Sequence, residues 1–115
     1  MTEVPLWSAD VSRHGSTSTV TLGGELDLMA AEPLRQLIIE ELDRPGTTDV
    51  AVDLAAVTFL DSAGLGALIL AYQHAEGTDR HLVMREPARP VRRVLEISGV
   101  YEMLVAPGDA TAPRV

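Results

Sequence analysis

The first part of the chain shows two strand-like patterns separated by a turn. Residues 19–22 (Thr-Val-Thr-Leu) alternate polar and apolar side chains, which is typical of a half-buried strand. Residues 4–13 have a weaker strand pattern, and Pro5 favours a position at the edge of a sheet. The turn-forming residues 14–18 lie between the two patterns, and Gly23-Gly24 follows the second. We therefore expect a β-hairpin whose second strand ends at these glycines.

A helix and a buried strand are predicted next. Pro33 is best tolerated in the first turn of a helix, so we expect the helix to begin near residues 30–32 and to end at residues 43–46. Residues 49–54 (Asp-Val-Ala-Val-Asp-Leu) are short and nearly all apolar, which predicts a central parallel strand covered on both faces. The apolar stripe that predicts the helix consists of Leu34, Leu37, Ile38 and Leu42.

The remaining pattern predicts alternating helices and strands. They are a helix over residues 63–76 with Gly77 as its cap, a strand over 81–84, a helix from Pro90 to Gly99 and a last strand over 101–105. The resulting class is α/β, with a mixed four- to five-stranded sheet and helices packed against it. We expect one domain over residues 1–105 and a loose tail over 106–115.

The composition of the chain indicates how many domains it forms and in which cellular compartment it is expected. A chain of 115 residues can form one domain with a modest core, and the absence of cysteine excludes disulfides and thiolate metal sites. The amino terminus has no apolar core like that of a signal peptide, and the longest apolar run, residues 63–72, is too short to cross a bilayer. We expect a cytoplasmic protein that does not enter a membrane.

Charge is distributed unevenly along the chain. The net charge is −8 and every basic residue is Arg, so direct binding of nucleic acid is not expected. Residues 25–61 carry nine acids against two arginines, whereas residues 80–93 carry five arginines. Solvated helix faces are the ordinary interpretation, and an acidic docking surface for a basic partner is the alternative. The role of the arginines from Arg85 to Arg93 stays open.

The turn after the central strand carries the most distinctive polar residues of the chain, Asp61-Ser62-Ala63-Gly64-Leu65-Gly66. A P-loop is excluded because the chain has no lysine, and a nucleophile elbow is not matched because residue 60 is Leu. A catalytic triad with His14, His74 or His81 stays open, so a small serine hydrolase remains an alternative. No residues have the spacing of metal ligands, and no cofactor is expected.

Two interpretations of Ser62 compete. Either Ser62 or Asp61 can cap the following helix, which is worth about 1 kcal/mol. A cap does not explain Gly64 and Gly66, each of which costs up to about 1 kcal/mol relative to Ala inside a helix. The glycines indicate a close approach of the neighbouring sheet or of a partner's backbone. In the second interpretation, Ser62 is an accessible hydroxyl that another protein phosphorylates, which would change docking and leave the fold intact.

Three segments resemble the motifs of a known family, in that family's order. Residues 57–68 (Val-Thr-Phe-Leu-Asp-Ser-Ala-Gly-Leu-Gly-Ala-Leu), preceded by Val-Asp-Leu at 52–54, resemble the signature of STAS-domain anti-sigma factor antagonists. Residues 24–27 (Gly-Glu-Leu-Asp) resemble its first motif, and residues 91–100 (Val-Arg-Arg-Val-Leu-Glu-Ile-Ser-Gly-Val) resemble its last. The resemblance covers about residues 4–105 and implies a STAS-like fold.

The resemblance implies partner switching in transcription regulation. The unphosphorylated antagonist of this family binds an anti-sigma factor that is also a serine kinase, which releases the sigma factor. The kinase then phosphorylates the antagonist, which dissociates, and a serine phosphatase resets it. The family's modified serine follows the motif's Asp, which is Ser62 here, and Ala63 stands where many members have a second Ser or Thr. The implied docking residues are Asp61, Ser62, Ala63, Gly64 and Gly66, with Glu25 and Asp27 beside them.

The sequence therefore predicts a bacterial regulatory protein and not an enzyme. We expect a phosphorylatable antagonist of an anti-sigma factor kinase. The alternatives are a STAS subunit of a stress-signalling or lipid-transport assembly and, from a different class, the small serine hydrolase.

Overall fold

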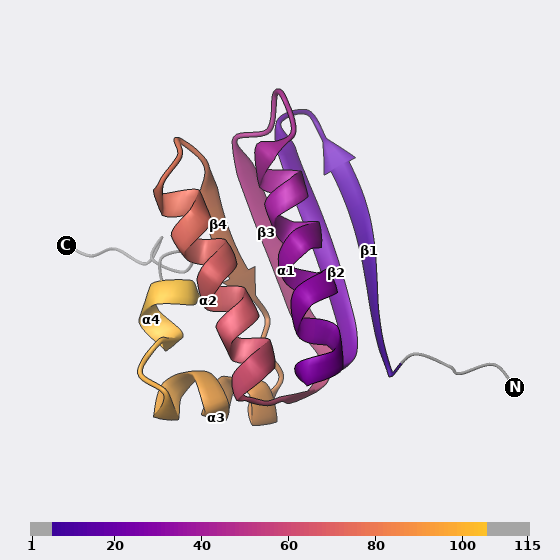
Figure 1. The fold of residues 1–115 in the computed structure, drawn as a ribbon, viewed down its shortest axis with the longest axis vertical. Coiled ribbons are helices and arrows are strands. Elements are labelled where there is room, and N and C mark those ends of the chain that lie inside the picture. Colours follow the sequence, from indigo (N-terminus) through magenta and orange to yellow (C-terminus); the bar gives the residue numbers. More distant parts are fainter. Residues whose placement is uncertain (1–5, 106–115) are drawn as a thin grey trace, which may run out of the picture.

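The computed structural model describes residues 6–105, which form a mixed four-stranded sheet together with four helices. The strands follow the order β1-β2-β3-β4; β1 is antiparallel to β2, and β2, β3 and β4 are parallel. The helices α1 and α2 lie side by side on one face of the sheet (Figure 1). The elements are β1 (Trp7–His14), β2 (Thr17–Leu26), α1 (Leu28–Asp43), β3 (Asp49–Leu60), α2 (Ser62–Glu76), β4 (His81–Arg85), α3 (Arg89–Ile97) and α4 (Tyr101–Leu104). The predicted α/β class with a mixed sheet is confirmed.

The core lies between the sheet and the pair of helices. Val50, Val52 and Leu54 of β3 point into it with the period expected of a strand, and the buried positions move to Val57 and Leu60 where the register against β2 shifts. Each fully buried aliphatic side chain contributes about 1.5–3 kcal/mol through removal of apolar surface from water. Side chains with 0–1% exposure include Val50, Val52 and Leu54 of β3, Leu34, Ile38 and Leu42 of α1, and Leu68 and Ala71 of α2.

The opposite face of the sheet is polar, so the prediction that β3 is covered on both faces is wrong. Thr21, Asp53 and Arg85 are neighbours across three strands. Thr21 and Arg85 are exposed, and Asp53 is half-buried. Ala51 on the same face is nevertheless buried, because it lies between Thr19 and Val83 of the flanking strands. A small residue in a central strand is covered by its cross-strand neighbours, which made β3 resemble a strand buried on both faces.

The predicted hairpin is confirmed, but its second strand does not end at Gly23-Gly24. The strand β2 continues to Leu26, with a register shift against β3 at the glycines. Gly24 has a φ of +82°, and a Cβ at this position would overlap the carbonyl oxygen of Leu6. The Glu25 N–H donates to that same oxygen at 2.8 Å. The glycine therefore admits the backbone of the preceding segment rather than ending the strand.

The helix α1 begins at Leu28, earlier than predicted. The Asp27 carboxylate caps it by accepting hydrogen bonds from the N–H groups of Met29 at 3.0 Å and Ala30 at 3.3 Å. Pro33 consequently lies in the second turn, where it cannot donate to the carbonyl of Met29. The cap by Asp27 and the burial of Ala30 and Leu34 outweigh that missing bond.

The predicted last strand is also wrong, because residues 101–104 form the short helix α4. Gly99, with a φ of +78°, turns the chain after α3, and the Tyr101 ring packs against the Arg92 guanidinium at 4.8 Å. This turn buries Leu104 completely. Tertiary packing thus overrides the strand propensity of a short apolar run. The tail predicted over residues 106–115 lies outside the described residues.

Candidate functional site

The candidate site lies at the edge of the sheet where the parallel strands β2 and β3 end. The carboxyl ends of β2 and β3 share this edge, and α1 and α2 begin there, whereas β4 ends opposite Asp53, in the middle of β3 (Figure 1). Residues at the ends of β2 and β3 pair directly, Glu25 with Phe59 and Leu26 with Leu60. The Asp61 N–H then donates to the Leu26 carbonyl at 3.3 Å. The two motifs, 34 residues apart at Asp27 and Asp61, therefore meet in space.

Asp61 rather than Ser62 caps α2. The Asp61 carboxylate accepts a hydrogen bond from the Gly64 N–H at 2.9 Å. Ser62 is the first residue of the helix, is exposed, and its hydroxyl has no hydrogen-bond partner among residues 6–105. The cap and the accessible hydroxyl are thus supplied by different residues, so the hydroxyl of Ser62 is not required to hold the helix.

The two glycines of the motif differ in their surroundings. A Cβ at Gly64 would overlap the carbonyl oxygen of Leu26, so this glycine lets α2 approach the end of β2 closely. A Cβ at Gly66 would have nothing within 4 Å. Close approach of the sheet therefore explains Gly64, whereas Gly66 leaves a bare position on the surface of α2, one turn after Ser62.

The acidic residues of the first motif border the site. Asp27 caps α1 as Asp61 caps α2, and both side chains are half-buried. Glu25 is half-buried as well. The structure thus brings Glu25, Asp27, Asp61 and Ser62 together, whereas Gly64 faces the sheet.

Exposed apolar side chains surround the same turns and were not predicted from the sequence. Leu28 is 72% exposed, Met29 is 81% exposed, and Phe59, which pairs with Glu25, is 48% exposed. Leu28 and Met29 fall outside the helical stripe formed by Leu34 and Ile38, whose earlier member is Ala30. That departure from the period was the available signal, because an apolar residue off the buried stripe faces solvent.

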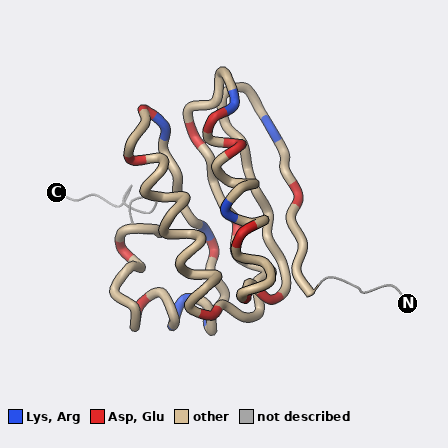
Figure 2. The backbone as a smooth tube through the Cα atoms, viewed as in Figure 1, with Lys and Arg blue, Asp and Glu red and all other residues tan. Residues whose placement is uncertain are grey.

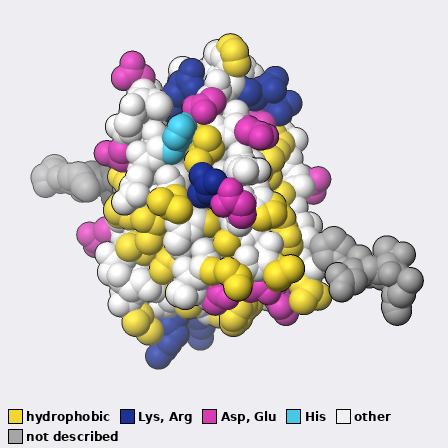
Figure 3. All heavy atoms as spheres, in the orientation of Figure 1, with side chains coloured by type: hydrophobic (Ala, Val, Ile, Leu, Met, Phe, Trp, Pro, Cys, Tyr) yellow, Lys and Arg dark blue, Asp and Glu magenta, His cyan; other side chains and the backbone are white. Residues whose placement is uncertain are grey.

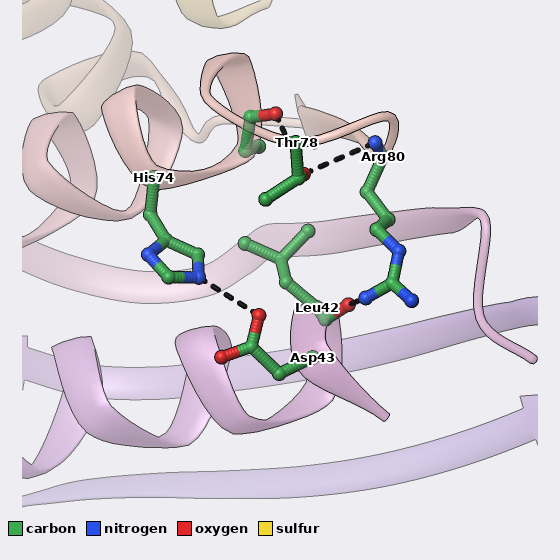
Figure 4. A network of polar contacts seen from close by, with 6 residues as sticks. Leu42, Asp43, His74, Thr78 and Arg80 are labelled. Atoms are coloured by element: carbon green, nitrogen blue, oxygen red, sulfur yellow. Dashed lines mark hydrogen bonds and ion pairs between the residues drawn. The ribbon is translucent and has the colours of Figure 1, made fainter. Parts of the chain in front are cut away.

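The histidines lie far from Ser62, which contradicts the triad alternative. His14 and His81 lie in the same cross-strand row as the first residue of β3, at the far end of the sheet from the site. The strand β3 runs for about 35 Å from this row before it reaches the site. His74 lies 12 residues beyond Ser62 along α2, or about 18 Å. Its Nε2 is 2.8 Å from Asp43 Oδ1, beside the contact of Arg80 with the Leu42 carbonyl (Figure 4). None of the three histidines is placed to activate the serine.

Comparison with known proteins supports the resemblance noted in the sequence. A family model described as "Mlab, STAS domain" matches residues 9–106. The chain therefore belongs to the STAS domain family. An anti-sigma-B factor antagonist from Staphylococcus epidermidis is 29% identical over 91 residues, which cover 79% of this chain and 83% of that protein.

Solved structures show the same fold. An anti-sigma factor antagonist from Mycobacterium paratuberculosis superposes with a TM-score of 0.72 and 26% identity over 95% of each chain. The unphosphorylated form of SpoIIAA gives a TM-score of 0.73 at 23% identity, covering 85% of this chain and 86% of that one. The phosphorylated form of Bacillus SpoIIAA gives 0.67 at 22% identity, with 85% and 89% coverage. Among residues 6–105, no helix is long and apolar enough to span a bilayer.

Proposed function

We propose that this chain is an anti-sigma factor antagonist whose Ser62 hydroxyl is phosphorylated by an anti-sigma factor serine kinase. The observation that carries the proposal is the geometry of Ser62. The side chain is exposed at the first position of α2 and makes no hydrogen bond with a described residue, because Asp61 supplies the cap. The relatives named as anti-sigma factor antagonists support the same role. The chain acts as a substrate and binding partner, and the kinase supplies the chemistry.

Docking of the unphosphorylated form uses the surface around Ser62. Gly66 carries no side chain to hold a partner away, and Leu28 and Met29 offer exposed apolar area next to the turn. Burial of such area at an interface is favourable, at about 25 cal/mol per Å² removed from water. Asp61 and Glu25 add charge at the border of this surface.

Phosphorylation would reverse docking through charge. Transfer of the terminal phosphoryl group of ATP to Ser62 Oγ releases ADP and the hydroxyl proton, and it adds about −1.5 to −2 charge close to Asp61 and Asp27. A partner would have to desolvate that charge on closing the interface, which weakens binding. The amino end of α2 favours the phosphate, so the fold persists. A protein of the same fold exists in both forms, which agrees with that expectation. A serine phosphatase then restores the docking form.

Peptide mass mapping after incubation with ATP and candidate anti-sigma factor kinases tests the proposal. We expect one phosphate on Ser62 of the wild type and none on Ser62→Ala, which should remain bound to the kinase. Ser12→Ala, at an exposed serine of β1, is the matched control and should behave as the wild type.

Three outcomes would contradict the proposal. The first is phosphate on another residue, or on none, with every kinase of this class from the same genome. The second is stable association with a different assembly that ATP does not alter, which would favour a STAS subunit of a stress-signalling or lipid-transport complex. The third is ester turnover that disappears in Ser62→Ala, which would favour a hydrolase.

A further inference from the structure

Three arginines, from the last residue of β4 into α3, have no carboxylate partner among residues 6–105. Arg85 ends β4, Arg89 begins α3 and Arg93 follows one turn later. All three are exposed, and their side chains form no ion pair or hydrogen bond with residues 6–105. By contrast, Arg13 and Arg35 pair with glutamates. The chain holds 17 acidic residues and nine arginines, so three unpaired guanidinium groups within nine residues need an explanation.

The arginines border a hollowed surface. One hollow, of about 550 Å³, is lined by Pro87, Arg89, Arg92, Arg93 and Glu96. A second, of about 380 Å³, shares Pro87 and Arg92 with the first and includes Arg85. Both are open to solvent, and basic side chains project from this end of the molecule (Figure 3). Glu86, between Arg85 and Pro87, has a φ of +56°, a conformation that costs energy for a residue other than glycine and is retained where surrounding structure imposes it.

The helix α3, with Arg89 and Arg93, lies at the end of the molecule where α2 begins (Figure 1). Arg85 pairs with Asp53, in the middle of β3, and α3 packs against β3. This end of the molecule therefore carries acidic residues where β2 and β3 end and basic residues along α3 (Figure 2). A partner that covers both parts meets two opposite charges in a fixed order.

We propose that Arg85, Arg89 and Arg93 form an arginine surface that binds an acidic segment of the kinase that docks at Ser62. The identity of this partner rests on the proposed function. Guanidinium groups bind carboxylates through paired hydrogen bonds, and opposite charges accelerate encounter and fix orientation. An acidic protein segment fits better than a small phosphate compound. The two hollows are open and adjoin each other from the end of β4 along α3, so they suit an extended ligand rather than a compact one.

The association rate constant with the kinase, measured by stopped flow at 50 mM and 500 mM salt, tests this proposal. Arg89→Gln and Arg93→Gln are each compared with Arg44→Gln, which removes the same charge from an exposed arginine after α1. We expect each arginine-surface variant to associate about threefold more slowly than the wild type at low salt, with the difference shrinking at high salt. Arg44→Gln should match the wild type.

The outcomes separate this proposal from the proposed function. If the kinase phosphorylates Ser62 and all three variants associate at the wild-type rate, the arginine surface is not part of the interface and the proposed function stands. If no kinase of this class associates with the chain, both proposals fail. Saturable binding of inorganic phosphate at Arg89 and Arg93 by NMR, with unchanged kinase association, would assign the surface to a small anion instead.

Discussion

At the scale of single residues, some residues of the motif after β3 stabilise the start of α2, and their neighbours are left accessible. Asp61 holds the amino end of α2 through Gly64, and Gly64 itself allows contact with the end of β2. Ser62 and Gly66 make no such contribution, since the hydroxyl is unbonded within residues 6–105 and the glycine faces open space. Stability and docking should therefore respond to different residues within five positions of one helix.

Alanine substitution at the two glycines should separate these tasks. Gly64→Ala should lower the free energy of unfolding by about 1–3 kcal/mol, because its Cβ would overlap a backbone oxygen that cannot move alone. Gly66→Ala should raise it by up to about 1 kcal/mol, because Ala favours the helix and meets no obstacle. Urea unfolding measures both effects. A stabilised Gly66→Ala protein that is phosphorylated as fast as the wild type would show that the partner does not approach this position.

At the scale of elements, one buried carboxylate joins α1 to the β1–β2 hairpin. Glu41 accepts hydrogen bonds from Arg13 Nε at 3.1 Å, from the Arg13 NH2 group at 2.7 Å and from Ser18 Oγ at 3.0 Å. Glu41 is 5% exposed and Ser18 is 1% exposed, so the bonds hold two elements distant in sequence. The hydrogen bond from Arg13 is the main reason that the pKa of the Glu41 carboxyl lies below its ordinary value; burial opposes the shift and Ser18 reinforces it.

The lowered pKa of Glu41 predicts a loss of stability in acid. Its contribution is complete above the ordinary carboxyl pKa and disappears as the pH falls through the lowered pKa, because the unfolded chain binds the proton more readily. Urea unfolding between pH 7 and pH 3 should show a shallower dependence on pH for Glu41→Gln, with lower stability at pH 7. Glu40→Gln changes an exposed neighbour on the same helix and should retain the wild-type slope. Equal slopes for all three proteins would disprove the role of Glu41.

At the scale of the whole molecule, the parallel arrangement of β2 and β3 brings the residues of the proposed docking site to one edge of the sheet. Two connections leave the sheet there and present Asp27 with Leu28 and Asp61 with Ser62, while the connection after β4 leaves opposite Asp53 and leads to α3. The helices α1 and α2 pack behind the first two turns and fix them to the core. A charge added at Ser62 therefore falls outside the packed interior.

A charged substitution at Ser62 should consequently leave the molecule folded. The free energy of unfolding of Ser62→Asp should lie within about 0.5 kcal/mol of the wild-type value, because the residue is exposed and a negative charge is favourable in the first turn of a helix. Changes in a ¹H–¹⁵N spectrum should be confined to the ends of β2 and β3 and the start of α2, while kinase binding is lost. Ser62→Asn, similar in size and neutral, should fold alike and still bind. Loss of binding in both variants would point to shape rather than charge.

Much of the fold could be predicted because it depends on local patterns. Alternation predicted the hairpin, helical spacing predicted α1, α2 and α3, and the run at residues 49–54 predicted the central strand. The failures have a common cause. Residues 101–104 are helical because this conformation buries the Leu104 side chain. The strand β2 continues past Gly24 because the backbone of Leu6 packs against this glycine. Those contacts join residues distant in sequence, which no local period contains.

The sequence by itself determined the class of fold and the position of the serine proposed for modification, since a strand, a polar cap and a helix start are encoded within a few neighbouring residues. Only the tertiary structure decided that Asp61 is the cap, that Gly64 faces the sheet while Gly66 faces outward, and that the three histidines lie away from Ser62. It also placed α3, with Arg89 and Arg93, at the end of the molecule where α2 begins. The physical reason is that strand pairing and helix packing set these distances, and both act between segments far apart along the chain.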